Sequence, residues 1–321
     1  MPPTVLLTNR TPSEDLADLD GLARIIHGPP DGGLMPRAKV MELIREVDAI
    51  ITNADMMVDE AMLDAASKLK IVAVVAIGTD NLDIPALTRR GVWATNVPDA
   101  FTETTGDAAM ALLLAVARRI VECDLYVRSG AWARDRFQPE RWIGMLLSGR
   151  TLGIVGYGRI GQAVERRARA FGMNVIYHRR TPSEDPGYRR FEDLLAESDV
   201  VSLHLPLTEQ TTHLINRERL ALMKRGAILI NLARGKVMDE QAVVDALESG
   251  HLGGAALDVF ENEPKIHPDL VKMDNVVLTP HIGGGTHESR RDARRLCAVN
   301  VALVLQGNPP RTPINQPTKV K

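Results

Sequence analysis

The sequence has little cysteine, few aromatic residues and almost no net charge. Its 321 residues include two cysteines, Cys123 and Cys297, which cannot form a disulfide framework and lack the spacing of metal ligands. The 39 lysines and arginines nearly balance 41 acidic residues, and a formal charge of −2 provides no field to hold nucleic acid or an anionic membrane. We therefore expect no metal, no nucleic-acid partner and no membrane partner.

Long hydrophobic runs are also missing. The longest, such as residues 109–117, fall far short of the ~20 residues that a membrane span requires. The N-terminal residues lack a basic region leading into an apolar one, so we expect a cytoplasmic protein. An apolar fraction of 45% is enough for more than one domain to bury its own core, and the length suggests two domains.

The N-terminal third alternates strand-like with helix-like segments. Short runs rich in β-branched residues are separated by segments with apolar residues at helical spacing. This alternation predicts a small parallel sheet flanked by helices, which we call the outer domain. The predicted strands are 4–8, 48–52, 70–78 and 91–97, and the helical segments between them include 38–47 and 59–69.

The pattern changes at Thr102. Residues 102–130 are too long and too evenly apolar for a strand and begin with helix-capping residues, so they predict one long, buried helix. Residues 129–148 contain Trp132 and Trp142 without clean periodicity, and we expect them to form a packing arm.

A second series of strands and helices begins at Thr151. Six segments are typical of buried parallel strands, enough for a full doubly wound sheet. A helical stretch at 288–304 follows, which could belong to either domain, and the polar tail at 311–321 is expected to be poorly ordered. The six strand segments are TLGIVG, NVIYH, DVVSLHL, GAILINLA, GGAALDVF and NVVLTPH.

The pattern G-x-G-x-x-G follows the first of these six strands. Gly156 would permit a tight turn, Gly158 would let the backbone approach a pyrophosphate, and Gly161 would let helix and strand pack closely. The helix N-terminus would stabilise the phosphate charge. A lone match could be a structural turn, but its place between a strand and a helix predicts a dinucleotide site.

No acidic residue stands at the end of the next strand. A site for NAD normally has Asp or Glu there to accept hydrogen bonds from the ribose, whereas this chain has Arg179, Arg180 and Thr181. Guanidinium groups match phosphate oxygens, so the sequence predicts a preference for NADP(H), with NAD(H) possible. Two alternatives stay open: the arginines could simply be exposed, or Glu184 and Asp185 could swing back.

Three chemically suited residues follow three later strands. In a parallel sheet these strand ends border the ligand crevice. Arg234 would bind a substrate carboxylate, His281 would protonate a carbonyl oxygen as hydride arrives at carbon, and Glu263 would hold the imidazole and favour its charged form. Each residue alone is more simply read as structural, but all three at successive strand ends predict hydride transfer to a carbonyl group.

Three motifs resemble the signatures of the D-isomer-specific 2-hydroxyacid dehydrogenase family. They are LINLARG at 229–235, ALDVFENEP at 256–264 and LTPHIGG at 278–284. The resemblance covers nearly the whole chain and is most specific over 151–284. Within the family it is closest to glyoxylate/hydroxypyruvate reductases, partly because YHRR at 177–180 is similar to their NADPH-preferring members.

The resemblance implies an α/β fold of two doubly wound parallel-sheet domains. A Rossmann cofactor domain would span 99–286, and a smaller, flavodoxin-like substrate-binding domain would combine 1–98 with 287–321. The cofactor domain would carry the contact of a homodimer through the arm at 129–148, although Trp132 and Trp142 could instead be buried within one subunit.

The resemblance also implies roles for particular residues. Arg234 would anchor the substrate, Glu263 and His281 would form the acid–base pair, and the backbone amides of Ile77 and Gly78 would meet the substrate carboxylate. The residues implied to bind the cofactor are Gly156, Gly158, Arg159, Ile160, Gly161, Arg179, Arg180, Thr181, Pro206, Thr212, Leu232, Ala233, Asp258 and Gly283.

Two departures from the family pattern affect the substrate side. Thr79 stands where a larger residue is common, and Arg141 and Trp142 lie near the place where related reductases reach a tryptophan into the partner's site. Two other functions remain alternatives. One is an NAD-linked dehydrogenase for a phosphoglycerate-like or bulky substrate, and the other is a nucleotide-sensing protein like the corepressors that share this fold.

Overall fold

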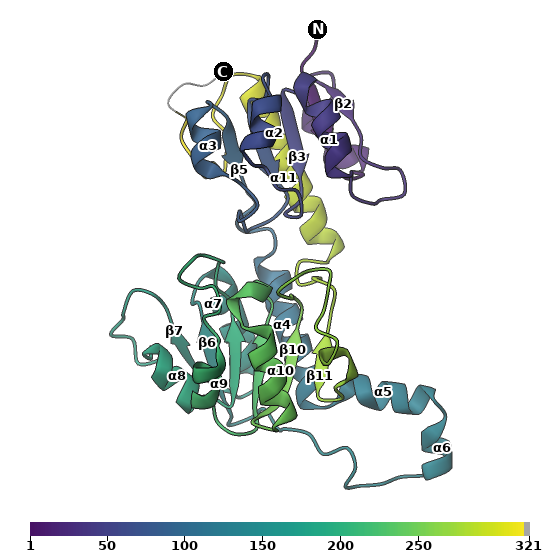
Figure 1. Ribbon diagram of the computed structural model, residues 1–321, viewed down its shortest axis with the longest axis vertical. Coiled ribbons are helices and arrows are strands. Elements are labelled where there is room, and N and C mark those ends of the chain that lie inside the picture. Colours follow the sequence, from purple (N-terminus) through teal and green to yellow (C-terminus); the bar gives the residue numbers. More distant parts are fainter. Residues whose placement is uncertain (318–321) are drawn as a thin grey trace. The chain divides into compact units, whose positions relative to one another are not determined.

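The computed structural model describes residues 1–317 and divides the chain into two compact units (Figure 1). The first unit combines Met1–Phe101 with the residues from Gly285 onward, and the second is Thr102–Gly284. The C-terminal helix therefore belongs with the N-terminal part of the chain. Both cysteines are free.

The first unit contains a five-stranded parallel sheet in the order β2-β1-β3-β4-β5. Four of its strands confirm the predicted ones; the fifth, β2, was missed because it has only three residues, none of them fully buried. The elements are β1 (Thr4–Leu7), β2 (Arg24–Ile26), α1 (Arg37–Leu43), β3 (Ala49–Thr52), α2 (Glu60–Ala65), β4 (Ile71–Val74), α3 (Ile84–Arg89), β5 (Trp93–Thr95) and α11 (His287–Leu305).

Both faces of this sheet are buried. Successive side chains of a strand point to opposite faces, so Leu6 packs in one core with α1, α2 and α3, while Val5 and Leu7 pack in another with Cys297 and its neighbours on α11. Burial on both faces explains why the strands read as continuous apolar runs.

The prediction of a poorly ordered tail is wrong for residues 311–317. The buried Asn315 side chain accepts from the Ala94 amide at 2.8 Å and donates to the Val92 carbonyl at 2.9 Å. The Ile314 amide also donates to the Ala94 carbonyl. These bonds hold the segment along β5 although it has no helix or strand pattern of its own; the last residues of the predicted tail lie outside the described part of the chain.

The second unit contains a six-stranded, all-parallel sheet in the order β11-β10-β9-β8-β6-β7, which confirms the six predicted strands. The strand order reverses beside β6, the position where doubly wound sheets bind ligands. The elements are α4 (Thr102–Ala117), α5 (Ile120–Arg128), α6 (Ala131–Asp135), β6 (Thr151–Val155), α7 (Arg159–Ala170), β7 (Asn174–His178), α8 (Phe191–Glu197), β8 (Val200–Leu203), α9 (Arg217–Leu222), β9 (Ala227–Asn231), α10 (Glu240–Glu248), β10 (Leu252–Leu257) and β11 (Val276–Leu278).

The prediction of one long buried helix from Thr102 is wrong. The chain forms α4 and then α5, separated at Arg119, whose φ of 53° is left-handed. The carbonyl of Ala117 accepts a hydrogen bond from Met145 on the returning chain instead of continuing the helix. Only α4 is buried in the core; α5 buries no residue and, with α6, projects from the rest of the second unit (Figure 1).

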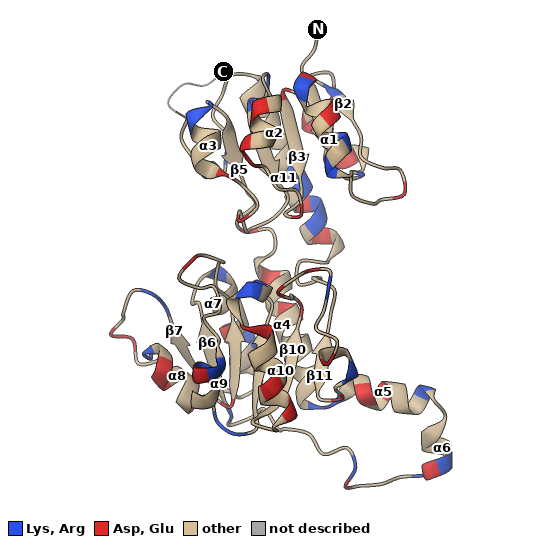
Figure 2. Cartoon of the chain, viewed as in Figure 1, with Lys and Arg blue, Asp and Glu red and all other residues tan. Residues whose placement is uncertain are grey.

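Charges of both signs are interspersed along both units, as Figure 2 shows, in keeping with the small net charge. Over residues 1–317, no helix combines the length and the apolar character needed to cross a bilayer.

Candidate active site

The three glycines of the loop after β6 meet different surroundings. Gly156 has a φ of 99°, and a Cβ there would lie 2.5 Å from the carbonyl oxygen of His204. A Cβ on Gly161 would lie 2.4 Å from the carbonyl oxygen of Gly156, so α7 could not approach the loop. A Cβ on Gly158, in contrast, would meet no atom within 4 Å. Gly158 faces open space, which is where a bound group could approach the backbone.

Helix α7 begins directly after Gly158, which caps it without a side-chain hydrogen bond. The first amides of a helix lack partners within the helix and carry a partial positive charge. The open space at Gly158 and these amides together fit the pyrophosphate of a dinucleotide.

The end of β7 is tied to this loop by aromatic contacts. Tyr157, between the first two glycines, stacks on Tyr177 of β7 with ring centroids 3.7 Å apart. Burial and a hydrogen bond to Glu165 raise the pKa of the Tyr157 hydroxyl above its ordinary value. No local pattern singles out Tyr157, because its packing depends on the Tyr177 ring of the neighbouring strand β7.

Basic side chains follow β7 directly. Arg179, Arg180 and Thr181 are all exposed, and the guanidinium Nε of Arg179 donates to the Thr181 carbonyl at 3.1 Å. The carboxylate of Asp185 accepts from the Gly187 amide at 2.7 Å and so stabilises a local turn. The strand end thus presents cationic groups, and the Asp185 carboxylate forms its hydrogen bond within its own loop.

The turn after β9 fixes the backbone on both sides of Arg234. The buried Asn231 side chain accepts from the Ala233 amide at 2.9 Å and donates to the Arg234 carbonyl at 3.0 Å. Leu232 and Ala233 are buried in this turn. A Cβ on Gly235 would lie 1.9 Å from the backbone of Phe260, so only glycine fits next to Arg234.

Asp258, after β10, holds the turn that carries His281. Its buried carboxylate accepts from the Thr279 hydroxyl at 2.6 Å and from the amides of Ile282 and Gly283, each at 2.8 Å. These bonds stabilise His281 at a left-handed φ of 55°, which is costly for a residue with a side chain. Asp258 therefore holds the backbone on both sides of His281 in place.

His281 and Glu263 form a hydrogen-bonded pair. The imidazole Nδ1 lies 2.9 Å from one carboxylate oxygen of Glu263, and the other oxygen accepts from the Phe260 amide at 3.0 Å. Burial alone would raise the pKa of Glu263, but the hydrogen bonds from His281 and Phe260, with the charges of His281 and Arg234, outweigh it and lower that pKa below its ordinary value. The carboxylate is thus kept ionised beside the imidazole.

Three neighbouring strand ends therefore bring together an arginine, a carboxylate and a histidine. Glu263 and His281 are in direct contact, and Arg234 is close enough for its charge to act on Glu263. The parallel sheet explains this, because β9, β10 and β11 are neighbours with their carboxyl ends at one edge.

The other predicted site residues lie on loops. Pro206 and Thr212 follow β8 and are exposed; the Pro206 carbonyl accepts from Thr211, and the Thr212 hydroxyl donates to the Thr208 carbonyl. Ile77 and Gly78 follow β4 in the first unit, where the Ile77 carbonyl accepts from the Asn96 side chain at 2.7 Å.

His204, after β8, was not singled out in the sequence. Its imidazole Nε2 lies 2.8 Å from the Ser202 hydroxyl, and burial lowers its pKa to about 4. Its carbonyl packs against Gly156, so this histidine supports the glycine loop.

Arg141 and Trp142 are packed within the arm. The Arg141 guanidinium lies 4.4 Å from the ring centroid of Tyr126 and 4.8 Å from that of Trp142. Trp132, by contrast, is 53% exposed, so the alternative that it is buried within one subunit is wrong.

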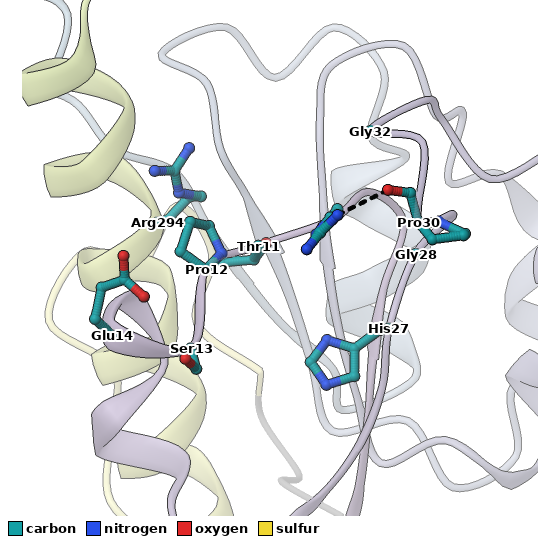
Figure 3. A pocket seen from close by; sticks show the side chains of 10 residues that line it. Thr11, Pro12, Ser13, Glu14, His27, Gly28, Pro30, Gly32 and Arg294 are labelled. Atoms are coloured by element: carbon teal, nitrogen blue, oxygen red, sulfur yellow. Dashed lines mark hydrogen bonds between the residues drawn. The ribbon is translucent and has the colours of Figure 1, made fainter.

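A cavity of about 780 Å³ lies in the first unit (Figure 3). None of the predicted site residues lines it. Two of its cationic side chains already have partners in this unit, since Arg10 donates to the Pro30 carbonyl at 2.9 Å and Arg294 pairs with the buried Asp15 at 2.7 Å. The described residues contain no group of three or more histidine, cysteine and acidic side chains that could hold a metal.

A parallel sheet with a glycine turn before α7, and a hydrogen-bonded histidine–glutamate pair at its carboxyl edge, are the features of a dinucleotide-binding oxidoreductase. Residues 110–283 match the family described as the D-isomer specific 2-hydroxyacid dehydrogenase, NAD binding domain. The chain belongs to this family.

Relatives and solved structures agree with this assignment. A glyoxylate reductase of Thermococcus litoralis is 46% identical over 98% of both chains, and one of Pyrococcus furiosus is 46% identical over 88% of this chain and 86% of its own. A Thermus thermophilus protein has a TM-score of 0.92 at 42% identity, covering 97% of this chain and 100% of its own. An NADPH-dependent glyoxylate/hydroxypyruvate reductase of Sinorhizobium meliloti, solved with NADP and malonate, has a TM-score of 0.88 at 31% identity, covering 100% and 99%.

Proposed function

We propose that this protein reduces a small 2-oxoacid, such as glyoxylate or hydroxypyruvate, to the D-2-hydroxyacid, with NADPH as the preferred reductant. The observation that carries this proposal is the pairing of His281 with Glu263 at 2.9 Å, under the charge of Arg234, at the carboxyl edge of a dinucleotide-binding sheet. The names of the relatives over nearly the whole chain support it.

In this proposal the glycine loop holds the dinucleotide. The amides at the start of α7, with Arg159 and Ile160, would face the pyrophosphate across the open space at Gly158. The remaining residues assigned to the cofactor are Gly156, Gly161, Arg179, Arg180, Thr181, Pro206, Thr212, Leu232, Ala233, Asp258 and Gly283. Bound there, a reduced nicotinamide supplies the hydride that the carbonyl carbon receives.

The protein's own groups bind and protonate the substrate. Arg234 would bind its carboxylate through two parallel hydrogen bonds, and the amides of Ile77 and Gly78 are our further candidates for that carboxylate. His281 would donate its proton to the carbonyl oxygen as negative charge develops there, and Glu263 would stabilise the imidazolium beforehand. Replacement of His281 should therefore impair proton transfer, whereas replacement of Arg234 should impair substrate binding.

The function is tested by following NADPH consumption with glyoxylate, hydroxypyruvate, pyruvate and a bulky aryl 2-oxoacid. We expect the small acids to be reduced and His281→Gln to abolish the activity. Turnover of the bulky acid alone would favour the alternative of a wider substrate mouth near Thr79. NADPH binding without turnover of any acid would favour the nucleotide-sensing alternative.

Cofactor preference is tested by replacing Arg179 with aspartate. Loss of the cation and gain of an anion beside a 2′-phosphate should raise KM for NADPH by at least about tenfold, while KM for NADH should stay the same or fall. The matched control is Arg225→Asp, which makes the same charge change at an exposed site before β9. An unchanged KM for NADPH in Arg179→Asp would refute the assigned phosphate site.

We also propose a homodimer formed through the arm. The segment from α5 to residue 146 exposes several large apolar side chains, and large exposed apolar patches on soluble proteins commonly mark interaction surfaces. A second copy would cover this surface. The exposed apolar residues are Ile120, Val121, Leu125, Val127, Trp132, Phe137, Ile143 and Leu146.

A further inference from the structure

The loop that carries Glu263 is fastened at both ends by one buried carboxylate. Glu240, the first residue of α10, is only 7% exposed. One of its carboxylate oxygens accepts from the Glu261 amide at 2.9 Å, and the other accepts from the His267 amide at 2.8 Å. Glu263 lies between these two attachment points, so the carboxylate of Glu240 spans the segment from which the Glu263 side chain extends.

The side chain of Glu240 is available for this contact because another residue caps its helix. Asp239 accepts from the Ala242 amide at 3.0 Å and satisfies the first turn of α10. The Asp239 amide is in turn held by the carbonyl of Ile215. Helix α10 buries Ala242 and Val243 in the core, so Glu240 extends from a rigid base.

A second set of bonds reinforces this attachment. The Glu240 amide donates back to the Glu261 carboxylate at 3.3 Å, and the other oxygen of Glu261 lies 2.8 Å from the His213 imidazole Nε2. The His267 imidazole is hydrogen-bonded to Gln241 at 3.0 Å. The two ends of the loop are thus tied to α10 by backbone and side-chain contacts together.

The position of His281, the other member of the pair, is fixed independently of Glu240. Asp258 holds the turn of His281 through the Thr279 hydroxyl and two amides, whereas the Glu240 carboxylate binds the amides of Glu261 and His267 in the other loop. The relative position of the carboxylate and the imidazole therefore depends on two separate attachments. The charges that lower the pKa of Glu263 are those of His281 and Arg234.

We propose that Glu240 is a positioning residue for the reaction, which sets the distance between the Glu263 carboxylate and the His281 imidazole. The inference rests on the proposed function. Glu240 itself would contact neither substrate nor cofactor. Catalytic groups need placement within about 0.5 Å, and a loop held at one end only would not provide it.

The test is Glu240→Gln, which keeps the size of the side chain. An amide offers one acceptor oxygen, and its NH2 group would oppose one of the two backbone donors, so one attachment is lost. We expect kcat for glyoxylate to fall about tenfold, the basic limb of the pH–rate profile to move down by about half a unit, and KM for NADPH to stay unchanged. Glu248→Gln, which removes a charge from the exposed end of the same helix, should change none of these.

A double-mutant comparison separates positioning from general destabilisation. In a Glu263→Gln background, Glu240→Gln should cause no further shift of the basic limb, because the carboxylate it positions is already gone. An equal shift in both backgrounds would overturn the proposal, as would an unmoved limb and kcat in the single variant. If Glu240→Gln does not fold, Glu240→Asp, which is too short to reach both amides, gives the same readouts.

Failure of this inference differs from failure of the proposed function. If His281→Gln keeps full activity, or Glu263→Gln leaves the limb in place, the acid–base assignment itself is wrong. If those two variants behave as expected while Glu240→Gln matches the wild type, only the role of Glu240 is wrong.

Discussion

Replacing Glu263 with glutamine should lower the pH at which reduction is lost. Glutamine keeps the shape of the side chain but removes the negative charge beside His281. The imidazole and carboxylate are 47% and 36% exposed, so their interaction is screened by water. For such a partly exposed pair 2.9 Å apart the interaction is worth at most about 1 kcal/mol, which would move the pH–rate profile by at most about 0.7 unit.

The sign follows from the charge that is lost. Without the carboxylate, the protonated form of the proton donor loses a stabilising charge, so the basic limb of kcat/KM for reduction should move down, by at most about 0.7 unit. The assay is the initial rate with glyoxylate across the pH range in which the folded protein is stable. Glu248→Gln is the control for a general loss of negative charge. A basic limb that stays in place in Glu263→Gln would remove this carboxylate from the mechanism.

Three further predictions follow from single positions. Gly158→Ala should unfold at the wild-type temperature yet lose NADPH affinity about tenfold or more in a titration, whereas Gly161→Ala should also lower the unfolding temperature, because only its Cβ meets backbone. Trp132→Glu should convert a dimer to a monomer in light scattering, and a wild-type protein that is already monomeric would contradict the proposed arm contact. His204 has a folded pKa of about 4 against an ordinary 6.5, so the unfolded chain takes up the proton first as pH falls. Stability should therefore drop by at most about 2 kcal/mol between pH 7 and 5, and His204→Gln should show a smaller drop in urea unfolding.

The sequence alone was sufficient to predict two parallel sheets flanked by helices and to name the residue types at the strand ends. Strands buried on both faces need continuous apolar residues, and a turn between β6 and α7 needs glycine, so these features have local signatures. Arg234 and His281 could be proposed together because parallel strands end at one edge, whatever their separation along the chain.

Helix boundaries and chain ends were decided by distant contacts. The helical pattern continues past Ala117, but helix α4 ends there because the Ala117 carbonyl accepts a hydrogen bond from the returning segment. The backbone then turns at Arg119, which has a left-handed φ. The polar residues near Asn315 look like a loose tail until their partners on β5, more than 200 residues earlier, are known. Neither outcome has a periodic pattern that a local reading could detect.

The supports of the candidate site belong to the same group. Asn231 and Glu240 look like ordinary polar residues in the sequence, and Asp258 was assigned only to the cofactor, yet each binds backbone amides in a particular turn or loop. Which amides a buried carboxylate accepts depends on how strands and helices pack, because a hydrogen bond requires partners within a few ångström and in line. The sequence therefore determined which chemical groups reach the edge of the sheet, and the tertiary structure decided how they are held.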